Sequence, residues 1–217
     1  ENVRWNFNWF CSVIGTDDEA LVKNHQIHSD IIRPVTRADI LPDPAQPGTF
    51  EADGLITDEP EVCLTIFSGD CIPILLYDPV RRCIAAVHAG WRGTAAGAAA
   101  RAAEAMVRDY GCAPEHILAA IGPGIGPCCF ATPRAVPDGL RVRLGPDAEP
   151  FVRPLSREGK FSVDLKGANA RWLERAGLAR ENIAICSACT ACQLDEFWSH
   201  RVQGGARGSM AAMIQLV

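Results

Sequence analysis

Short runs of apolar residues, each bounded by turn-forming residues, organise the first half of the chain. Three of them follow one another closely, at residues 63–67, 72–77 and 83–87, and an Asp-Pro pair separates the last two. Runs of this length between turn residues are typical of strands buried in a sheet. Two further apolar runs, at 20–23 and 31–35, flank a polar segment. The pattern predicts a buried β-sheet whose strand ends meet polar loops.

An alanine-rich segment after these runs predicts the strongest helix of the chain, over residues 94–110. Alanine has the highest helix propensity, Thr94 offers an N-terminal cap, and Gly111 offers a C-terminal stop. The opening residues 1–7 show the pattern of an amphipathic helix, and three prolines within 41–48 predict an extended surface loop. Both helices carry an apolar face that needs a partner.

Strands and helices alternate less regularly in the second half of the chain. We expect strands at 117–121, 183–186 and 211–216 and a helix at 165–176. Because this mixture lacks a strict βαβ period, it favours an α+β fold over a doubly wound one. We therefore predict an α+β fold, a single layered domain of mixed β-sheets flanked by helices, over residues 1–217.

Length and composition agree with one soluble domain. The chain has 217 residues, 48% of them hydrophobic, which is enough to bury a sizeable core. The formal net charge is −5 and no stretch gathers Lys or Arg, so we expect no nucleic-acid partner. Charges or proline interrupt the apolar stretches within about ten residues, short of the roughly 20 that cross a bilayer, so we expect no membrane partner. Because the chain opens inside a helical pattern, we expect that an N-terminal segment of the natural protein precedes Glu1.

Ten cysteines permit either disulfides in a secreted protein or free thiols in a reducing compartment. A chain of this size with a large apolar core does not need disulfides to fold. Cys63, Cys83 and Cys186 lie in apolar runs, where cysteine acts as a small hydrophobic residue. We therefore predict free thiols and a cytoplasmic location.

Cys71 and His88 are the first candidates for chemistry. Cys71 follows a Ser-Gly-Asp turn, and His88 opens a turn that contains Trp91 and Arg92 between glycines. Both lie at predicted strand ends, where loops build functional sites. A cysteine and a histidine at such positions are more often core residues, but the polar surroundings favour a site.

His25 and His28 lie three positions apart in a polar segment. If the segment is extended, the two side chains face opposite sides, so only one of them points at a given site. Two histidines and one cysteine are a common ligand set of catalytic zinc, because the fourth position stays open for water or substrate. We therefore consider a zinc site that combines a histidine of this segment with Cys71 and His88.

A second group of cysteines has the spacing Cys186-x-x-Cys189-x-x-Cys192, which resembles half of a structural zinc or cluster site. The adjacent pair Cys128 and Cys129 could supply a fourth thiolate. Neighbouring cysteines rarely both bind one tetrahedral ion, so buried free thiols are the default interpretation here.

The glycine-rich loop at 122–126 lacks the Gly-Lys-Ser/Thr ending and the spacing of a nucleotide-binding loop. Arg92 and Arg201 are better candidates for an anionic ligand, because the guanidinium group matches the geometry of phosphate. Solvent-exposed surface arginines are the alternative interpretation.

Several longer stretches together carry a family resemblance. They are residues 53–60 (DGLITDEP), 69–79 (GDCIPILLYDP), 87–93 (VHAGWRG), 121–130 (IGPGIGPCCF), 197–201 (FWSHR) and 210–214 (MAAMI). They are similar to the laccase-domain (multicopper polyphenol oxidase, YfiH-like) family, which is also described as zinc-dependent purine nucleoside phosphorylases. The resemblance covers nearly the whole chain.

The resemblance implies a fold, a metal and an activity. It assigns zinc, with copper as the alternative, to His28, Cys71 and His88, and selects His28 over His25. It implies phosphorolysis of adenosine, inosine and methylthioadenosine by a glycosyltransferase, and deamination of adenosine. The catalytic residues would be Cys71, His88 and Arg92, and Arg92 with Arg201 would bind phosphate.

Two other activities stay open. A copper-dependent, laccase-like polyphenol oxidase needs further histidines for oxygen reduction, and the chain has five histidines in all, of which His25, His116 and His200 are spare. A metal-free Cys-His amide hydrolase, as in editing of peptidoglycan precursors, would use His88 to activate Cys71. Three reactive side chains at strand ends argue against a mere binding module.

Overall fold

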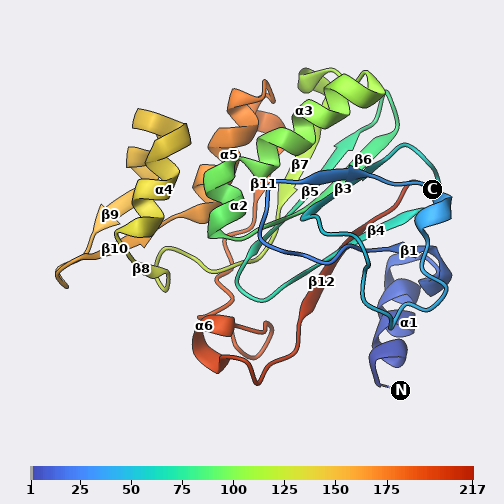
Figure 1. Cartoon of the computed structure of the whole chain (residues 1–217), viewed down its shortest axis with the longest axis horizontal. Coiled ribbons are helices and arrows are strands. Elements are labelled where there is room, and N and C mark those ends of the chain that lie inside the picture. Colours follow the sequence, from blue (N-terminus) through green and yellow to red (C-terminus); the bar gives the residue numbers. More distant parts are fainter. Residues whose placement is uncertain (1) are drawn as a thin grey trace.

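The computed structural model describes residues 2–217 and arranges them as helices packed on a large mixed sheet, with a smaller sheet on its opposite face (Figure 1). The large sheet has the strand order β11-β7-β5-β6-β3-β2. Its strands are β2 (Ile32–Pro34), β3 (Gly54–Thr57), β5 (Ile72–Asp78), β6 (Cys83–Ala89), β7 (Leu118–Ile121) and β11 (Ile183–Ile185). The central pairings are antiparallel, and the two outer pairings, β2 with β3 and β7 with β11, are parallel. The predicted class of mixed sheets flanked by helices is confirmed.

A three-stranded sheet of β1 (Leu21–Val22), β4 (Cys63–Ser68) and β12 (Met210–Ile214) covers one face of the large sheet. Successive residues of β6 face opposite sides and divide the core in two. Ile84 and Ala86 pack with Leu64 and Ile66 between the two sheets. Val87 packs on the other face, against the helices. This burial on both faces explains why β6 is apolar at nearly every position.

Helices α2 (Trp91–Ala96), α3 (Ala98–Tyr110) and α5 (Leu165–Arg175) cover the other face. The expected continuous helix over 94–110 is wrong, because Gly97 has a φ of 85° and separates α2 from α3. Thr94 is not an N-terminal cap; it lies buried inside α2, and its hydroxyl accepts a hydrogen bond from Asn169 at 2.9 Å. Gly111 ends α3 as predicted.

The remaining elements lie at the periphery of the two sheets. They are α1 (Asn2–Ile14), α4 (Ala135–Leu144), α6 (His200–Gln203), the small sheet of β8 (Ala131–Pro133), β10 (Lys160–Val163) and β9 (Val152–Pro154), and 3-10 turns at Asp18–Ala20, Arg37–Asp39, Pro114–His116, Gly145–Phe151 and Arg180–Asn182. The opening helix is present, although Glu1 lies outside the described residues. The small sheet escaped prediction because its strands are short and partly exposed, and because β8 and β9 carry proline.

All ten cysteines are free thiols. Cys63 and Cys83 are fully buried, as expected, whereas Cys186 follows the last residue of β11 and is only partly buried. None of the helices within residues 2–217 has the length and apolar character needed to span a membrane.

Candidate metal centre

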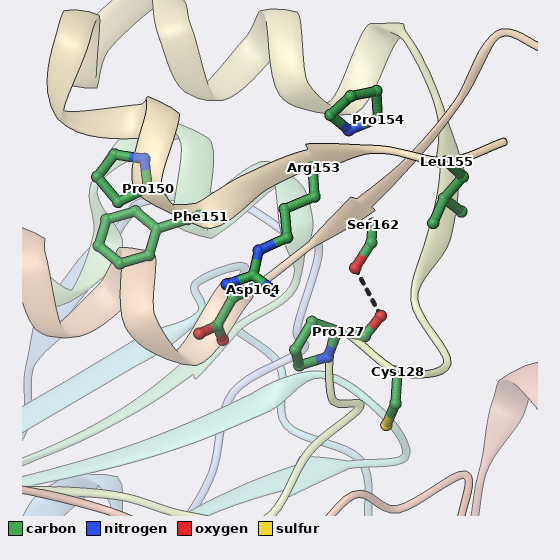
Figure 2. Close-up of a pocket in the computed structure, with 9 residues that line it drawn as sticks. All are labelled: Pro127, Cys128, Pro150, Phe151, Arg153, Pro154, Leu155, Ser162 and Asp164. Atoms are coloured by element: carbon green, nitrogen blue, oxygen red, sulfur yellow. Dashed lines mark hydrogen bonds between the residues drawn. The ribbon is translucent and has the colours of Figure 1, made fainter.

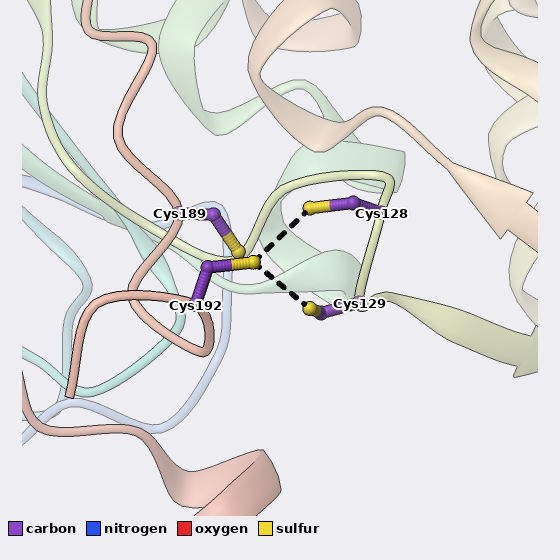
Figure 3. A group of neighbouring side chains, drawn as sticks. All are labelled: Cys128, Cys129, Cys189 and Cys192. Carbon is purple, nitrogen blue, oxygen red and sulfur yellow. Dashed lines mark hydrogen bonds between the residues drawn. The ribbon is translucent and has the colours of Figure 1, made fainter.

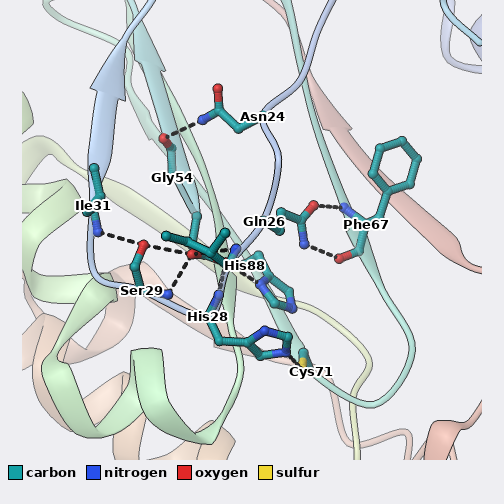
Figure 4. Close-up of polar contacts among 11 residues, drawn as sticks. Asn24, Gln26, His28, Ser29, Ile31, Gly54, Phe67, Cys71 and His88 are labelled. Carbon is teal, nitrogen blue, oxygen red and sulfur yellow. Dashed lines mark hydrogen bonds and ion pairs between the residues drawn. The ribbon is translucent and has the colours of Figure 1, made fainter. Parts of the chain in front are cut away.

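His28, Cys71 and His88 meet at one edge of the large sheet (Figure 4). His88 belongs to β6, Cys71 directly precedes β5, and His28 comes from the loop between β1 and β2. Because Pro73 of β5 pairs with His88, the antiparallel register brings Cys71 close to the histidine. One possible ligand atom from each of the three residues lies within 4.8 Å of the others, and Cys71 Sγ is 3.9 Å from His28 Nε2.

Unusual backbone conformations make this meeting possible. His28 has a φ of 64° and Asp70 a φ of 88°, both in the left-handed region that side chains rarely adopt. Gly90 lies directly behind the site. A Cβ atom there would be 2.8 Å from His28 Cδ2 and 3.1 Å from Cys71 Sγ. The glycine of the His-Ala-Gly-Trp turn is thus required for space.

Asp53, which sequence reasoning did not select, organises the centre. Its buried carboxylate accepts hydrogen bonds from the backbone N–H groups of His28 at 3.0 Å and of Ser29, and from the Ser29 hydroxyl at 2.7 Å. It also accepts one from His88 Nδ1 at 2.8 Å. One side chain therefore positions both histidines. The sequence did contain a signal for Asp53, since this carboxylate opens the DGLIT stretch directly before a fully buried strand.

The electrostatics follow from these contacts. Burial raises the pKa of Asp53, but hydrogen bonds from His88 and Ser29 outweigh it and lower the pKa to about 2. Burial opposes charge on His88 too, yet Asp53 and Cys71 raise its pKa to about 9. Burial likewise raises the pKa of Cys71, and the two histidines lower it to about 7. The protein thus favours a thiolate at Cys71.

The donor set fits a divalent zinc ion. With Nδ1 bonded to Asp53, His88 keeps Nε2 as its remaining nitrogen, which is the usual carboxylate–histidine arrangement behind a metal ligand. One thiolate and two imidazoles leave a coordination position open. His25, in contrast, pairs with Glu51 in an isolated bridge and lines a different cavity. The expectation that only one of the two histidines faces this edge agrees with that placement.

A cavity of about 380 Å³ adjoins the centre and is lined by His28 and Cys71. The two predicted anion-binding residues, Arg92 and Arg201, both line it, and so do His200 and Arg207. Arg207 was not predicted. Its Nε is buried and has no hydrogen-bond partner among the described residues.

Among the described residues that line this cavity, Asp70 is the one acidic residue, and its carboxylate is already hydrogen-bonded. It accepts hydrogen bonds of 2.6 Å from the Thr190 hydroxyl and from the backbone N–H of Arg201. The guanidinium group of Arg201 in turn donates to the carbonyl oxygens of Cys129 and Ala131 at 3.2 and 3.0 Å. Three arginines and one aspartate line the cavity, and this excess of positive charge suits an anion.

The walls of the cavity also offer apolar surface for a flat ring. Trp91, Phe130 and Leu165 line it together with the charged groups. Arg92 stacks 4.5 Å from the centre of the Trp91 ring, and Arg201 lies 5.3 Å from that of Phe130. Aromatic faces beside guanidinium groups suit a ligand that is apolar in one part and anionic in another.

Two further features lie outside this centre. A cavity of about 420 Å³ is lined by Pro127, Cys128, Phe151, Arg153 and others (Figure 2), but it contains none of the residues predicted for catalysis or phosphate binding. Its Asp164 already caps α5 through the N–H of Gly167.

Four cysteines also meet, namely Cys128, Cys129, Cys189 and Cys192, whereas Cys186 is not among them. All four are free thiols and Cys189 is buried, as the default interpretation expected, but Cys128 and Cys192 are exposed, so that interpretation is wrong about the burial of these two.

A family model and several known proteins match this chain, and the family model covers all of it. The family model described as multi-copper polyphenol oxidoreductase laccase matches residues 1–217. Purine nucleoside phosphorylase YlmD of Geobacillus stearothermophilus is 38% identical over 195 residues, which cover 87% of this chain and 69% of that protein. Human purine nucleoside phosphorylase LACC1 is 33% identical over 168 residues, 76% of this chain but only 38% of its own length. The crystal structure of the Bacillus licheniformis hypothetical protein YfiH superposes with a TM-score of 0.94 at 34% identity, covering 99% of this chain and 81% of that one.

Proposed function

The chain belongs to the multi-copper polyphenol oxidoreductase laccase family, and from this membership and the geometry of the centre we propose that it is a zinc-dependent purine nucleoside phosphorylase. The observation that carries the proposal is the position of the His28–Cys71–His88 group beside a cavity lined by three arginines. We propose adenosine, inosine and methylthioadenosine as substrates, with deamination of adenosine as a second activity. Residues 1–217 would form one domain of this kind, and its free thiols favour a cytoplasmic location.

Zinc would be held by His28, Cys71 and His88. When bound, it would supply a Lewis acid or a water of lowered pKa at the open coordination position. Asp53 holds His88 by Nδ1 and fixes the backbone of the His28 loop, so two of the three ligands are oriented in advance. Orienting the zinc ligands would be the main role of the side chains around the centre.

Phosphate would bind to Arg92, Arg201 and Arg207. Arg207 lines the cavity together with Arg92 and Arg201, so its guanidinium group would add a third positive charge for the phosphate. Phosphorolysis requires phosphate to attack the anomeric carbon of ribose while the bond to the purine breaks. The arginines would hold the nucleophile in place, and Trp91 and Phe130 would offer apolar surface to the purine.

A specific observation also supports a metal-free Cys-His hydrolase. The lowered pKa of Cys71 and the raised pKa of His88 correspond to a thiolate–imidazolium pair, with Asp53 in the orienting position of a triad. Such an enzyme would cleave amides, as in editing of peptidoglycan precursors. It would use Cys71 as a nucleophile and would not lose activity to a chelator.

A multicopper oxidase has less support. Within residues 2–217, the groups able to hold a metal ion are the His28–Cys71–His88 group and the four cysteines, and neither contains the further histidines that reduction of oxygen by several coppers requires. Copper could still occupy the His28–Cys71–His88 group, because such sites bind copper more tightly than zinc.

The test combines metal analysis with a phosphorolysis assay on protein purified without added metal. We expect phosphate-dependent release of purine base from inosine and adenosine, and Cys71→Ala should lose both this activity and one zinc equivalent. Cys186→Ala is the matched control, since Cys186 is partly buried and belongs to neither group. Activity on amides that survives chelation, or oxidation of phenols with several bound coppers, would replace this proposal with one of the two alternatives.

A further inference from the structure

We propose that Cys128, Cys129, Cys189 and Cys192 form a second metal site, a structural zinc site with four thiolate ligands (Figure 3). The inference is independent of the catalytic proposal, because it rests on a different group of side chains. Two segments of the chain supply these cysteines, the turn after β7 and the loop after β11. They are 60 or more positions apart in the sequence, as in Cys128 and Cys192 with a separation of 64.

The distances between the sulfur atoms match a tetrahedral zinc site. Cys192 Sγ lies 3.6 Å from Cys128 Sγ and 3.4 Å from Cys129 Sγ, and all four sulfurs lie within 4.8 Å of one another. Zn–S bonds of about 2.3 Å in a tetrahedron separate the sulfurs by about 3.8 Å. Sulfurs joined in a disulfide would be about 2.05 Å apart. The spacing thus agrees with four ligands around one ion.

The adjacent pair, Cys128 and Cys129, is the feature that spoke against this site at the level of sequence. In an extended strand, neighbouring side chains point to opposite faces. Here the pair lies in a tight turn instead, in which the N–H groups of Cys129 and Phe130 both donate to the Gly126 carbonyl oxygen at 3.0 Å. This turn directs both sulfurs toward Cys192. The objection therefore does not apply to this backbone.

The other pair has the geometry of a metal-binding turn. The N–H of Cys192 donates to the carbonyl oxygen of Cys189 at 3.0 Å and closes the Cys-x-x-Cys turn. The N–H of Gly126 donates to Cys189 Sγ at 3.1 Å, a contact that stabilises a thiolate ligand. A Cβ atom on Gly126 would lie 3.2 Å from Cys128 Sγ and 3.4 Å from Cys189 Sγ. Glycine at this position thus keeps the space between the two pairs free.

A metal here would tie together the two loops that border the catalytic cavity. Phe130 follows Cys129 directly, and His200 and Arg201 lie eight and nine positions after Cys192; all three line the cavity. In the protein chain alone, the loops are linked by the isolated bridge between Gly124 and Cys189, by the N–H of Gly126 on Cys189 Sγ, and by the hydrogen bonds from Arg201. A zinc ion would add four bonds to these links and fix the two loops to each other.

The experiment counts zinc by mass spectrometry of the metal in protein purified without added metal. We expect two zinc ions per chain in the wild type, one in Cys192→Ser and one in Cys128→Ser. Cys71→Ser should also retain one, namely the ion of the four-cysteine site, so this variant tests the second site even if the catalytic proposal fails. Cys186→Ser is the matched control from the same Cys-x-x-Cys-x-x-Cys motif and should keep both ions.

Two further measurements distinguish the loss of the metal site from misfolding of a variant. Cys192→His should keep the second zinc, since three cysteines and one histidine are a common structural set. Cobalt(II) added to metal-free Cys71→Ser should give the strong absorption of a tetrahedral thiolate complex, and zinc should abolish it. Wild type with a single zinc ion that Cys192→Ser leaves unchanged would overturn the proposal. A disulfide among these four cysteines in freshly purified protein, seen as a mass loss of one hydrogen pair, would overturn it as well.

Discussion

Asp53→Asn is the most informative single substitution, because one carboxylate holds both histidines of the candidate centre. The side chain keeps its size, so packing around the buried position is preserved. What changes is the charge and one acceptor oxygen. An amide nitrogen now faces either His88 Nδ1 or the N–H of Ser29, and both of those groups donate hydrogen bonds to Asp53 in the wild type.

The expected size of the effect follows from these contacts. Loss of the partner behind a metal-bound histidine typically costs 10- to 100-fold in metal affinity, or about 1.4–2.8 kcal/mol. One buried donor left without a partner costs about 1–3 kcal/mol of folding stability. We therefore expect zinc affinity at the Cys71 site to fall about 10- to 100-fold and the free energy of unfolding to fall by about 1–3 kcal/mol.

Zinc affinity would be measured by competition with a coloured chelator, and stability by urea unfolding of the metal-free protein. Both should be done in the Cys192→Ser background, so that only one site binds zinc. Asp58→Asn is the matched control, since Asp58 belongs to the same sequence stretch but is exposed. If Asp53→Asn binds zinc as tightly as this control does, Asp53 does not orient the ligands and its proposed role at the centre is refuted.

Three other substitutions test the site and the fold. Arg207→Ala should raise the KM for phosphate about tenfold, because one charge-assisted contact worth about 1.4 kcal/mol is lost. Arg134 is exposed and lies outside the cavity, so Arg134→Ala should leave this KM unchanged. Initial rates at varied phosphate concentration measure both values. Gly90→Ala should abolish tight zinc binding because the new methyl group would overlap both neighbouring ligands, while Gly205→Ala, with open space around it, should bind zinc normally in the same competition assay. Gly97→Ala should destabilise the protein by about 1–2 kcal/mol in urea unfolding, since a side chain at φ 85° is strained; an unchanged midpoint would contradict this account of the break between α2 and α3.

The sequence predicted the central architecture well because local patterns determine it. The apolar runs at 63–67, 72–77 and 83–87 became β4, β5 and β6, since each is long enough to be recognised and is buried on both sides. The Ala-rich helix was correct at its end but not at its start. Near its start, Gly97 adopts a positive φ and lies beside Trp172 of α5, and this outweighs the helix propensity of the surrounding alanines.

For the candidate centre, the residue types and their positions at strand ends were predicted from the sequence, and the family resemblance selected His28 over His25. Those assignments remain predictions for metal analysis to test. Asp53 and Arg207 were missed, because neither has a local signature: their roles come from neighbours that are distant in sequence, such as His88 for the carboxylate.

The sequence by itself determined the central strands β4, β5 and β6 and the end of the Ala-rich helix, because hydrophobic period and glycine positions act over a few residues. The small sheet of β8, β9 and β10 and the break at Gly97 lay beyond it. Only the tertiary structure decided which reactive side chains share a site. Cys128 and Cys129 sit next to each other in the sequence and look ill-suited to one ion, yet a turn closed on Gly126 directs both toward Cys192. Cys186 has the Cys-x-x-Cys spacing of a metal site, yet it does not belong to the four-cysteine group. It directly follows the end of β11, and the chain approaches the other loop only three residues later, at Cys189. Such meetings depend on backbone turns and strand order, which no local pattern of residues records.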